Sequence, residues 1–221
     1  MFVINILKRI QGRVFGIFEK RYMKQARTRL VNENFTLLTN NCLGGVAYHL
    51  LAKKFDSPTI NTYIKNPDFC MLCSDIDYYF NEELEFFKSN ERPCPCAYLG
   101  RGDKRIVIQF EHYNTEEEAA KKWNERKRRI HRENLYLILN DGNGLTVDDT
   151  KLLENVKCKR KIVFTSREKP EISDSFVLRT LKKYETAVFV QTDRHFFTGL
   201  RPWQREFDIV AWLNGEQEFR C

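Results

Sequence analysis

The sequence predicts a three-layer α/β domain around a central, mostly parallel sheet. Most of its apolar runs of strand length are apolar on both faces, which is typical of strands that helices cover on both sides. Helical patterns separate several of these runs, so strands and helices alternate along the chain. The 221 residues, 42% of them hydrophobic, are enough for one domain of ordinary size with its own core.

The individual elements follow from these patterns in chain order. We expect strands at 35–39, 96–99, 105–110, 135–139, 161–165, 186–190 and 208–213. We expect helices at 45–53, 67–74, 115–131, 146–155 and 175–184. The pattern at 115–131 is the clearest, because Thr115 and Glu118 have the spacing of a capping box, with acids in the first turn and bases in the last.

The net charge of +7 is concentrated in the first 30 residues. This stretch holds eight Lys and Arg residues and a single acid, Glu19, whereas the rest of the chain is formally neutral. Apolar residues alternate with the basic ones at spacings that a helix would place on two faces. We therefore interpret residues 1–34 as a basic amphipathic helical arm and residues 35–221 as a single α/β domain.

Two kinds of partner are possible for this arm, a protein surface and a membrane surface. The apolar run stops at Lys8 and Arg9, far short of the roughly 20 residues that span a bilayer, and no signal-peptide cleavage pattern follows it. The arm could pack on the domain or on a second subunit in a homo-oligomer, or it could contact an anionic membrane surface peripherally. We expect a cytoplasmic protein, with the inner face of the membrane as the place of any such contact.

Nucleic acid is not expected as a partner, because a binding groove needs basic residues spread over the domain and here their excess lies in the arm. The seven cysteines, without a secretory signal, indicate a reducing compartment. Two close pairs, Cys70 with Cys73 and Cys94 with Cys96, fit zinc spacing poorly, so we expect free thiols and no metal site. The sequence identifies no cofactor.

Polar residues follow five of the predicted strands at the points where they end. The five segments are Asn40-Asn41, Glu111-His112, Asn140-Asp141, Ser166-Arg167 and Gln191-Thr192-Asp193. The carboxyl ends of parallel strands share one edge, and open α/β sheets bind ligands outside that edge. We therefore expect these residues to surround one cleft. The alternative is that they are ordinary loop residues and helix caps.

The turn that follows the first predicted strand is the clearest candidate for ligand binding. Gly44 and Gly45 would let backbone amides approach an anion at the start of the next helix, beside Asn40 and Asn41. The turn is not a P-loop, because the lysine and hydroxyl residues of that motif are missing. Equally, Asn41 could cap the helix while the glycines permit close packing of helix on strand.

Cys42 and His112 are the candidate catalytic pair. A helix N-terminus lowers the pKa of a thiol, and His112 at another strand end would serve as the base. The alternatives are an inert small side chain for Cys42 and a local hydrogen bond for His112.

Three further residues complete the candidate site. Asp141 adds a carboxylate in a Gly-rich turn, where it could act in catalysis or meet a hard cation, although a turn role is favoured. Asp193 supplies a charge for ligand binding. Trp203 supplies a ring that could stack on a sugar or base, or cover the edge of the core.

Several segments together resemble a bacterial family of unknown function whose members are often labelled exopolysaccharide biosynthesis proteins. They are NNCLGGVAYHLL with SPTINTYI after it, FEHYNTEEEAAKKWNERKRRI, and FDIVAWLNG near the end, and the likeness covers most of residues 35–215. The resemblance implies a role in cell-surface glycan synthesis, as a transferase-like enzyme that binds an activated sugar, acyl or phosphate-bearing ligand at the carboxyl edge of the sheet. The alternative is a non-catalytic binding or assembly protein of a polysaccharide-synthesis complex.

Overall fold

A sheet of four parallel strands lies at the centre of the computed structural model, which describes the backbone of residues 2–216 and the side chains of residues 11–216. The strand order is β1-β5-β6-β7, with bounds Thr36–Thr39, Leu135–Asn140, Arg160–Thr165 and Ser175–Val177. Thr39 lies opposite Ile138, and Asn140 lies opposite Phe164. The carboxyl ends of β1, β5 and β6 therefore meet at one edge, as the sequence predicts.

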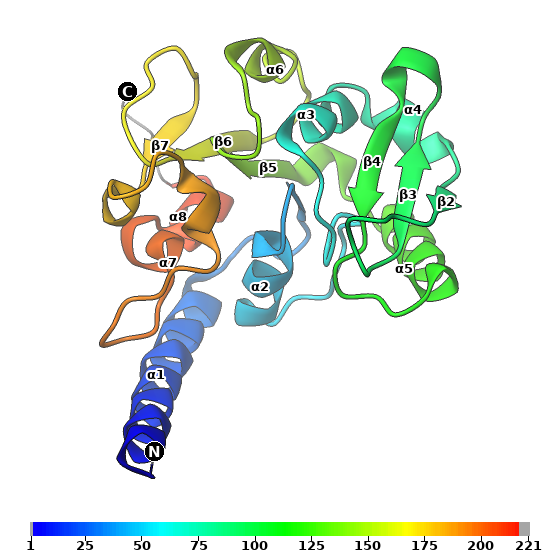
Figure 1. Cartoon of the computed structure of the whole chain (residues 1–221). Coiled ribbons are helices and arrows are strands. Elements are labelled where there is room, and N and C mark those ends of the chain that lie inside the picture. Colours follow the sequence, from blue (N-terminus) through cyan, green and yellow to red (C-terminus); the bar gives the residue numbers. More distant parts are fainter. Residues whose placement is uncertain (1, 217–221) are drawn as a thin grey trace.

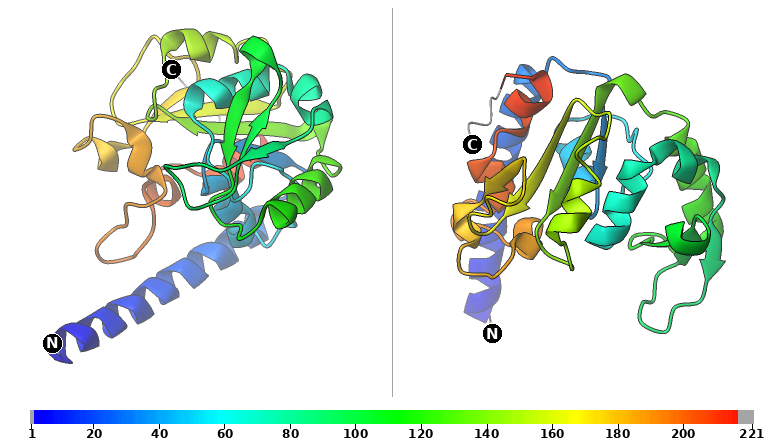
Figure 2. Two further views of the ribbon diagram at one scale, coloured as in Figure 1. Left: turned by 45° about the vertical axis from the view of Figure 1, so that its right-hand side comes forward. Right: turned by 90° about the horizontal axis from the view of Figure 1, so that it is seen from above.

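Helices cover both faces of this sheet (Figures 1 and 2). Leu37 and Ile138 enter one hydrophobic core, whereas Leu38 and Leu137 enter another on the opposite face. Around the first core lie α1 (Phe2–Arg29), α2 (Leu43–Leu50), α7 (Pro202–Glu206) and α8 (Ile209–Asn214). Around the second lie α3 (Asn66–Ser74), α4 (Ile76–Asn81), α5 (Glu116–Lys127) and α6 (Val147–Lys151). The predicted three-layer α/β fold is confirmed.

A second, antiparallel sheet consists of β2 (Glu85–Phe87), β3 (Cys96–Leu99) and β4 (Ile106–Gln109). The predicted strands at 96–99 and 105–110 are present, but they belong to this separate sheet. The turn that joins them is short, and its Gly100 and Gly102 have positive φ values of 82° and 56°. A connection this short permits only antiparallel pairing. His112, which follows β4, therefore does not follow a strand of the parallel sheet.

Three segments near the C-terminus correct the predicted structure. Residues 186–190, expected as a strand, form the 3-10 helix η4 (Ala187–Val190), and residues 208–213, also expected as a strand, form α8. The expected helix at 175–184 instead contains β7 and the 3-10 helix η3 (Arg179–Leu181). β7 pairs with β6, with Phe176 opposite Phe164, and so takes the edge position that a strand at 186–190 would need.

Capping explains why the apolar segment 209–214 is helical. The Asp208 carboxylate accepts hydrogen bonds from the amides of Val210 and Ala211, at 3.2 and 3.1 Å. Gly215 ends the helix with a left-handed φ of 82°. Both capping residues are visible in the sequence, and they outweigh the strand-like composition between them.

Helix α1 confirms the helix expected in the first 30 residues. Its first turns extend away from the rest of the molecule (Figure 1), whereas Ala26 and Leu30 at its other end are buried in the first core. An ion pair of 2.6 Å between Arg29 and Asp208 joins this end to the start of α8. The boundary at residue 34 remains a prediction. Within residues 2–216, no helix combines the length and apolarity that crossing a bilayer requires.

Three buried asparagines connect the carboxyl edge of the parallel sheet to α3. Asn66 accepts a 2.7 Å hydrogen bond from Asn40 Nδ2 at the end of β1, and its own Nδ2 donates to the carbonyls of Asn140 and Gly142 beyond β5. The three asparagine side chains are at most 1% exposed. Because an unpaired buried amide or carbonyl is costly, these bonds fix α3 against the edge.

Replacement of Asn66 by alanine should lower the free energy of unfolding by roughly 2–3 kcal/mol, since it leaves several buried polar groups without partners. Asn155→Ala, at an exposed position, should change it by less than about 0.5 kcal/mol. Chemical denaturation of the two variants and the wild-type chain measures the difference. Equal stability of all three would contradict the assigned role of Asn66.

Candidate functional site

The structure brings Cys42 and His112 together. Cys42 immediately precedes α2, and His112 lies in the loop between β4 and α5. The Cys42 Sγ and His112 Nε2 atoms are 3.3 Å apart, within hydrogen-bond distance for sulfur. Cys42 is half-buried, while His112 is exposed. A thiol and an imidazole in contact at the surface have the geometry of a nucleophile and its base.

Three further side chains accompany this pair. Glu111 forms an ion pair with Arg92, with 3.5 Å between Oε1 and Nη1. The Arg92 guanidinium also lies over the ring of Tyr63, 5.8 Å from its centroid. The site therefore combines a thiol, an imidazole, a carboxylate, a guanidinium and a phenol. Sequence reasoning missed Arg92 and Tyr63, because neither follows a predicted strand of the parallel sheet.

The electrostatics at Cys42 correct one expectation. Burial, and then the negative charge of Glu111, raise the pKa of the Cys42 thiol above its ordinary value, whereas the helix N-terminus was expected to lower it. Burial likewise raises the pKa of Tyr63, although the charge of Arg92 opposes this. At neutral pH the resting thiol is therefore protonated, and any attack by Cys42 requires a base such as His112.

The segment 57–64, the SPTINTYI stretch, holds the two halves of this site together. The Ile64 amide donates to the carbonyl of Asn40 at the end of β1, at 2.9 Å. The neighbouring Tyr63 exchanges two backbone hydrogen bonds with Gln109 on β4, at 2.8 and 2.9 Å. The segment thus bridges the parallel and antiparallel sheets. This bridge places Cys42, in the turn after β1, beside His112, in the loop after β4.

Buried polar contacts fix this bridging segment. The Ile60 carbonyl accepts hydrogen bonds from the Tyr113 hydroxyl and from Arg126, at 3.2 and 3.0 Å. Thr59 Oγ1 accepts from the amide of Thr39 on β1 at 3.1 Å. Tyr113 directly follows His112, so the same contacts that hold the segment also hold the histidine loop.

The residues of the 40–45 turn have mainly structural contacts. Asn41 Oδ1 accepts from the Leu43 amide at 2.9 Å, and Thr39 Oγ1 accepts from the Gly44 amide at 3.1 Å. An anion at these amides would have to displace both bonds. A Cβ on Gly44 would lie only 2.6 Å from Thr39 Oγ1, and one on Gly45 would lie 3.2 Å from Ile60 Cγ2. These contacts match the capping and packing interpretation of the turn.

Asp141 also lies at the carboxyl edge of the parallel sheet, but its carboxylate contacts Ala187 and Lys169. Its Oδ1 accepts from the Ala187 amide at 2.6 Å, and its Oδ2 lies 3.1 Å from Lys169 Nζ. The side chain is completely buried and fixes the first residue of η4. These contacts are those of a structural carboxylate in a turn.

The structure does not bring Asp193 and Trp203 to this site. Asp193 follows η4 instead of a strand, and it pairs with Lys183 at 3.0 Å. Trp203 is fully buried in the first core, where its Nε1 donates to Gln191 at 3.3 Å. Its ring therefore covers the core and is not available to stack on a sugar or base, which corrects that part of the prediction.

The two cysteine pairs lie in different parts of the fold. Cys70 and Cys73 belong to α3, whereas Cys94 lies just before β3 and Cys96 is its first residue. All four are free thiols, and burial raises the pKa of Cys70 to about 12 and that of Cys96 to about 11. Within the described part of the chain, no three His, Cys, Asp or Glu side chains converge as metal ligands would.

Comparison with known proteins gives the family but no activity. The model of a family described as a domain of unknown function (DUF1919) matches residues 14–214. An uncharacterized protein of Haemophilus influenzae strain Rd is 29% identical over 188 residues, which cover 84% of this chain and 87% of the relative. The match reaches from the middle of α1 to the end of α8, so this chain belongs to the DUF1919 family of unknown function.

Proposed function

We propose that this protein is an acyl-transfer enzyme in which Cys42 is the nucleophile and His112 its general base. The observation that carries the proposal is the distance of 3.3 Å between Cys42 Sγ and His112 Nε2. A thiol with an adjacent imidazole suits attack on an activated carbonyl better than transfer of a glycosyl group. The assignment to exopolysaccharide or other cell-surface glycan synthesis comes from the resemblance of the segments described above.

The reaction has two balanced steps. In the first, His112 accepts the thiol proton while the Cys42 sulfur attacks the donor carbonyl; the leaving group departs with that proton, and the acyl group remains on sulfur as a thioester. In the second, His112 accepts a proton from an acceptor hydroxyl, whose oxygen attacks the thioester. The acyl group passes to the acceptor, and the proton returns to the thiol.

The alternative function is a non-catalytic binding or assembly protein. It is favoured by a pocket of about 690 Å³ that lies away from Cys42, at the amino ends of β5 and β6, where Leu135 and Lys159 contribute to its lining. In such a protein the contact between Cys42 and His112 would be only a local hydrogen bond. The experiments below distinguish the two functions, because only in the enzyme should acylation of Cys42 depend on His112 as its base.

The full chain should release p-nitrophenolate from p-nitrophenyl acetate in a burst that matches the protein concentration, with the acetyl group on Cys42 by peptide mass spectrometry. Cys42→Ala should abolish the burst, and His112→Ala should slow it roughly a hundredfold or more, the usual range for loss of a general base. Cys94→Ala, which changes another half-buried free thiol, is the matched control and should leave the burst intact.

Thermal unfolding of each variant shows whether it remains folded. Acetylation at another residue, or an equal burst from folded Cys42→Ala, would refute the nucleophile. An unchanged burst rate in folded His112→Ala would refute the base.

Removal of the Glu111 charge should lower the pKa of the Cys42 thiol, because that charge is one of the two causes that raise it. The measurement is the pH at which half of Cys42 is alkylated by iodoacetamide, followed on its own peptide by mass spectrometry. Glu111→Gln should shift this midpoint to lower pH, whereas Glu116→Gln, on the exposed start of α5, should leave it in place. Equal midpoints for Glu111→Gln and the wild-type chain would contradict this electrostatic assignment.

A further inference from the structure

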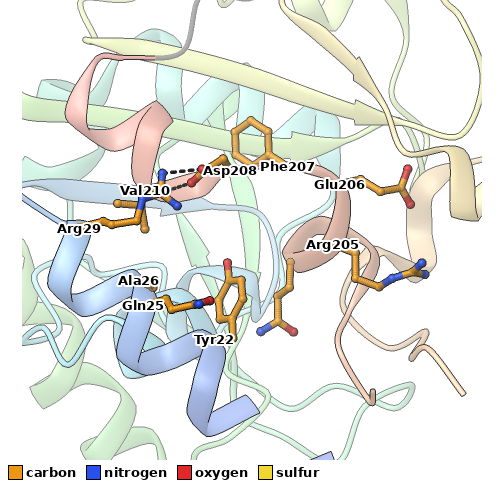
Figure 3. Close-up of a pocket in the computed structure, with 10 residues that line it drawn as sticks. Tyr22, Gln25, Ala26, Arg29, Arg205, Glu206, Phe207, Asp208 and Val210 are labelled. Carbon is orange, nitrogen blue, oxygen red and sulfur yellow. Dashed lines mark hydrogen bonds and ion pairs between the residues drawn. The ribbon is translucent and has the colours of Figure 1, made fainter. Parts of the chain in front are cut away.

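Arg29, in the pocket between α1 and the segment 204–210, is a cation that the fold already uses (Figure 3). The pocket has a volume of about 280 Å³, and on its lining the Arg29 guanidinium lies only 2.6 Å from the Asp208 carboxylate. That carboxylate also accepts hydrogen bonds from the amides of Val210 and Ala211. A ligand carboxylate would therefore have to compete with a tight ion pair for this guanidinium.

Arg92 is different, because its contacts within the protein are weak. Its Nη1 lies 3.5 Å from Glu111 Oε1, which is long for a charge-assisted hydrogen bond. It forms no other ion pair or hydrogen bond with residues 11–216, so most of its N–H donors are free. The Arg92 side chain is 46% exposed and that of Glu111 is 30% exposed. A ligand that approaches from solvent therefore meets the guanidinium more readily than the carboxylate.

Tyr63 supplies a second donor beside this guanidinium. The Arg92 guanidinium lies over the Tyr63 ring, 5.8 Å from its centroid. The Tyr63 hydroxyl forms no hydrogen bond within the described part of the chain, and burial raises its pKa, so it stays protonated at neutral pH and can donate. Two backbone hydrogen bonds with Gln109 hold Tyr63 in place. A guanidinium and a phenol side by side are suited to bind the oxygens of a carboxylate.

Backbone contacts place these donors beside the thiol of Cys42. Tyr63 belongs to the segment that bridges the two sheets. The amide of the next residue, Ile64, donates to the carbonyl of Asn40, shortly before Cys42. Burial raises the pKa of both the Cys42 thiol and the Tyr63 hydroxyl, and the charge of Glu111 adds to this in both, as one carboxylate near both groups would. A molecule whose carbonyl carbon reaches the thiol can therefore extend to Tyr63.

The loop that carries Arg92 is also held at this place. The carbonyl of Pro95, in the same loop, accepts a 2.9 Å hydrogen bond from the amide of Phe110. Phe110 directly precedes Glu111 and His112 in the sequence. The guanidinium, the phenol, the thiol and the imidazole therefore lie around one surface.

We propose that Arg92 and Tyr63 bind a carboxylate of the acyl donor while its activated carbonyl lies at Cys42. The inference rests on the proposed function and adds the class of substrate, an activated acyl group that carries a carboxylate at its other end. A carboxylate fits better than a phosphate dianion, because Glu111 partly offsets the charge of Arg92.

The first test measures the attraction without any acyl transfer. The full chain is treated with β-maleimidopropionate or with its uncharged amide, and the rate of Cys42 modification is followed on its own peptide by mass spectrometry. The ratio of the two rates, carboxylate over amide, should be higher at Cys42 than for a free uncharged thiol such as N-acetylcysteinamide. Added salt should reduce this preference, since the cation is exposed.

Two matched pairs of variants assign the preference to its residues. Arg92→Gln should lower it roughly threefold to fivefold, the size expected for loss of one exposed ion pair. Arg101→Gln, which removes another exposed arginine that pairs with a carboxylate, should leave it unchanged. Tyr63→Phe removes only the hydroxyl and should lower the preference about twofold or more. Tyr98→Phe, whose ring lies beside Arg105 in a similar contact, is its control.

The second test uses acyl donors. The p-nitrophenyl monoester of adipic acid should acylate Cys42 faster than the p-nitrophenyl ester of adipic acid monoamide, because only the first carries a carboxylate for Arg92. Arg92→Gln should remove this preference, and Arg101→Gln should keep it. Thermal unfolding shows whether each variant is folded.

The outcomes separate this inference from the proposed function. Equal carboxylate preference in folded Arg92→Gln and Arg101→Gln, or no preference in the wild-type chain, would overturn the subsite even if esters acylate Cys42. A maleimide preference that Arg92→Gln removes, without acylation of Cys42 by either ester, would uphold the carboxylate subsite and refute acyl transfer.

Discussion

The bridge formed by residues 57–64 is the constraint on which the site depends. Cys42 lies in the turn after β1 of the parallel sheet, and His112 follows β4 of the antiparallel sheet. The backbone bonds of Ile64 to Asn40 and of Tyr63 to Gln109 join the two sheets at the point where these residues lie. The bridge is itself held by buried hydroxyl and guanidinium groups, whose loss would leave unpaired polar atoms in the interior. The distance between sulfur and imidazole is thus set by the packing of two sheets.

Most of the polar residues at the carboxyl edge of the parallel sheet have structural roles. Asn40, Asn66 and Asn140 are buried and link the strands to α3. Asp141 caps η4. Gly44 and Gly45 allow α2 to pack tightly against Thr39 and Ile60. By contrast, the half-buried Cys42 and the exposed His112 contact each other in a way that a reaction could use, so a polar strand end by itself is a weak sign of function.

Much of the fold could be predicted from sequence, because its signals are local. Continuous apolar runs mark β1, β5 and β6, and the cap Thr115 with its acidic first turn marks α5. Errors arise where a nonlocal contact or an overlooked cap decides the outcome. The segment after Asp208 has the composition of a strand but is capped as a helix, and the pairing of β7 with β6 excludes a strand at 186–190. Cys42 and His112 were candidates because each follows a strand, yet they meet through a bridge between two sheets that no local pattern reveals.

The central claim, that Cys42 and His112 are in contact in the folded chain, is tested most directly by the ¹⁵N chemical shift of His112 Nε2. In uniformly labelled full-length protein, replacement of Cys42 by alanine removes the sulfur that lies 3.3 Å from this nitrogen. The account predicts a clear change in the Nε2 shift of His112, with the shifts of His49, His131 and His195 unchanged and no change at any of the four histidines in Cys94→Ala. A His112 signal that is the same in Cys42→Ala and in the wild-type chain, with both folded, would contradict it.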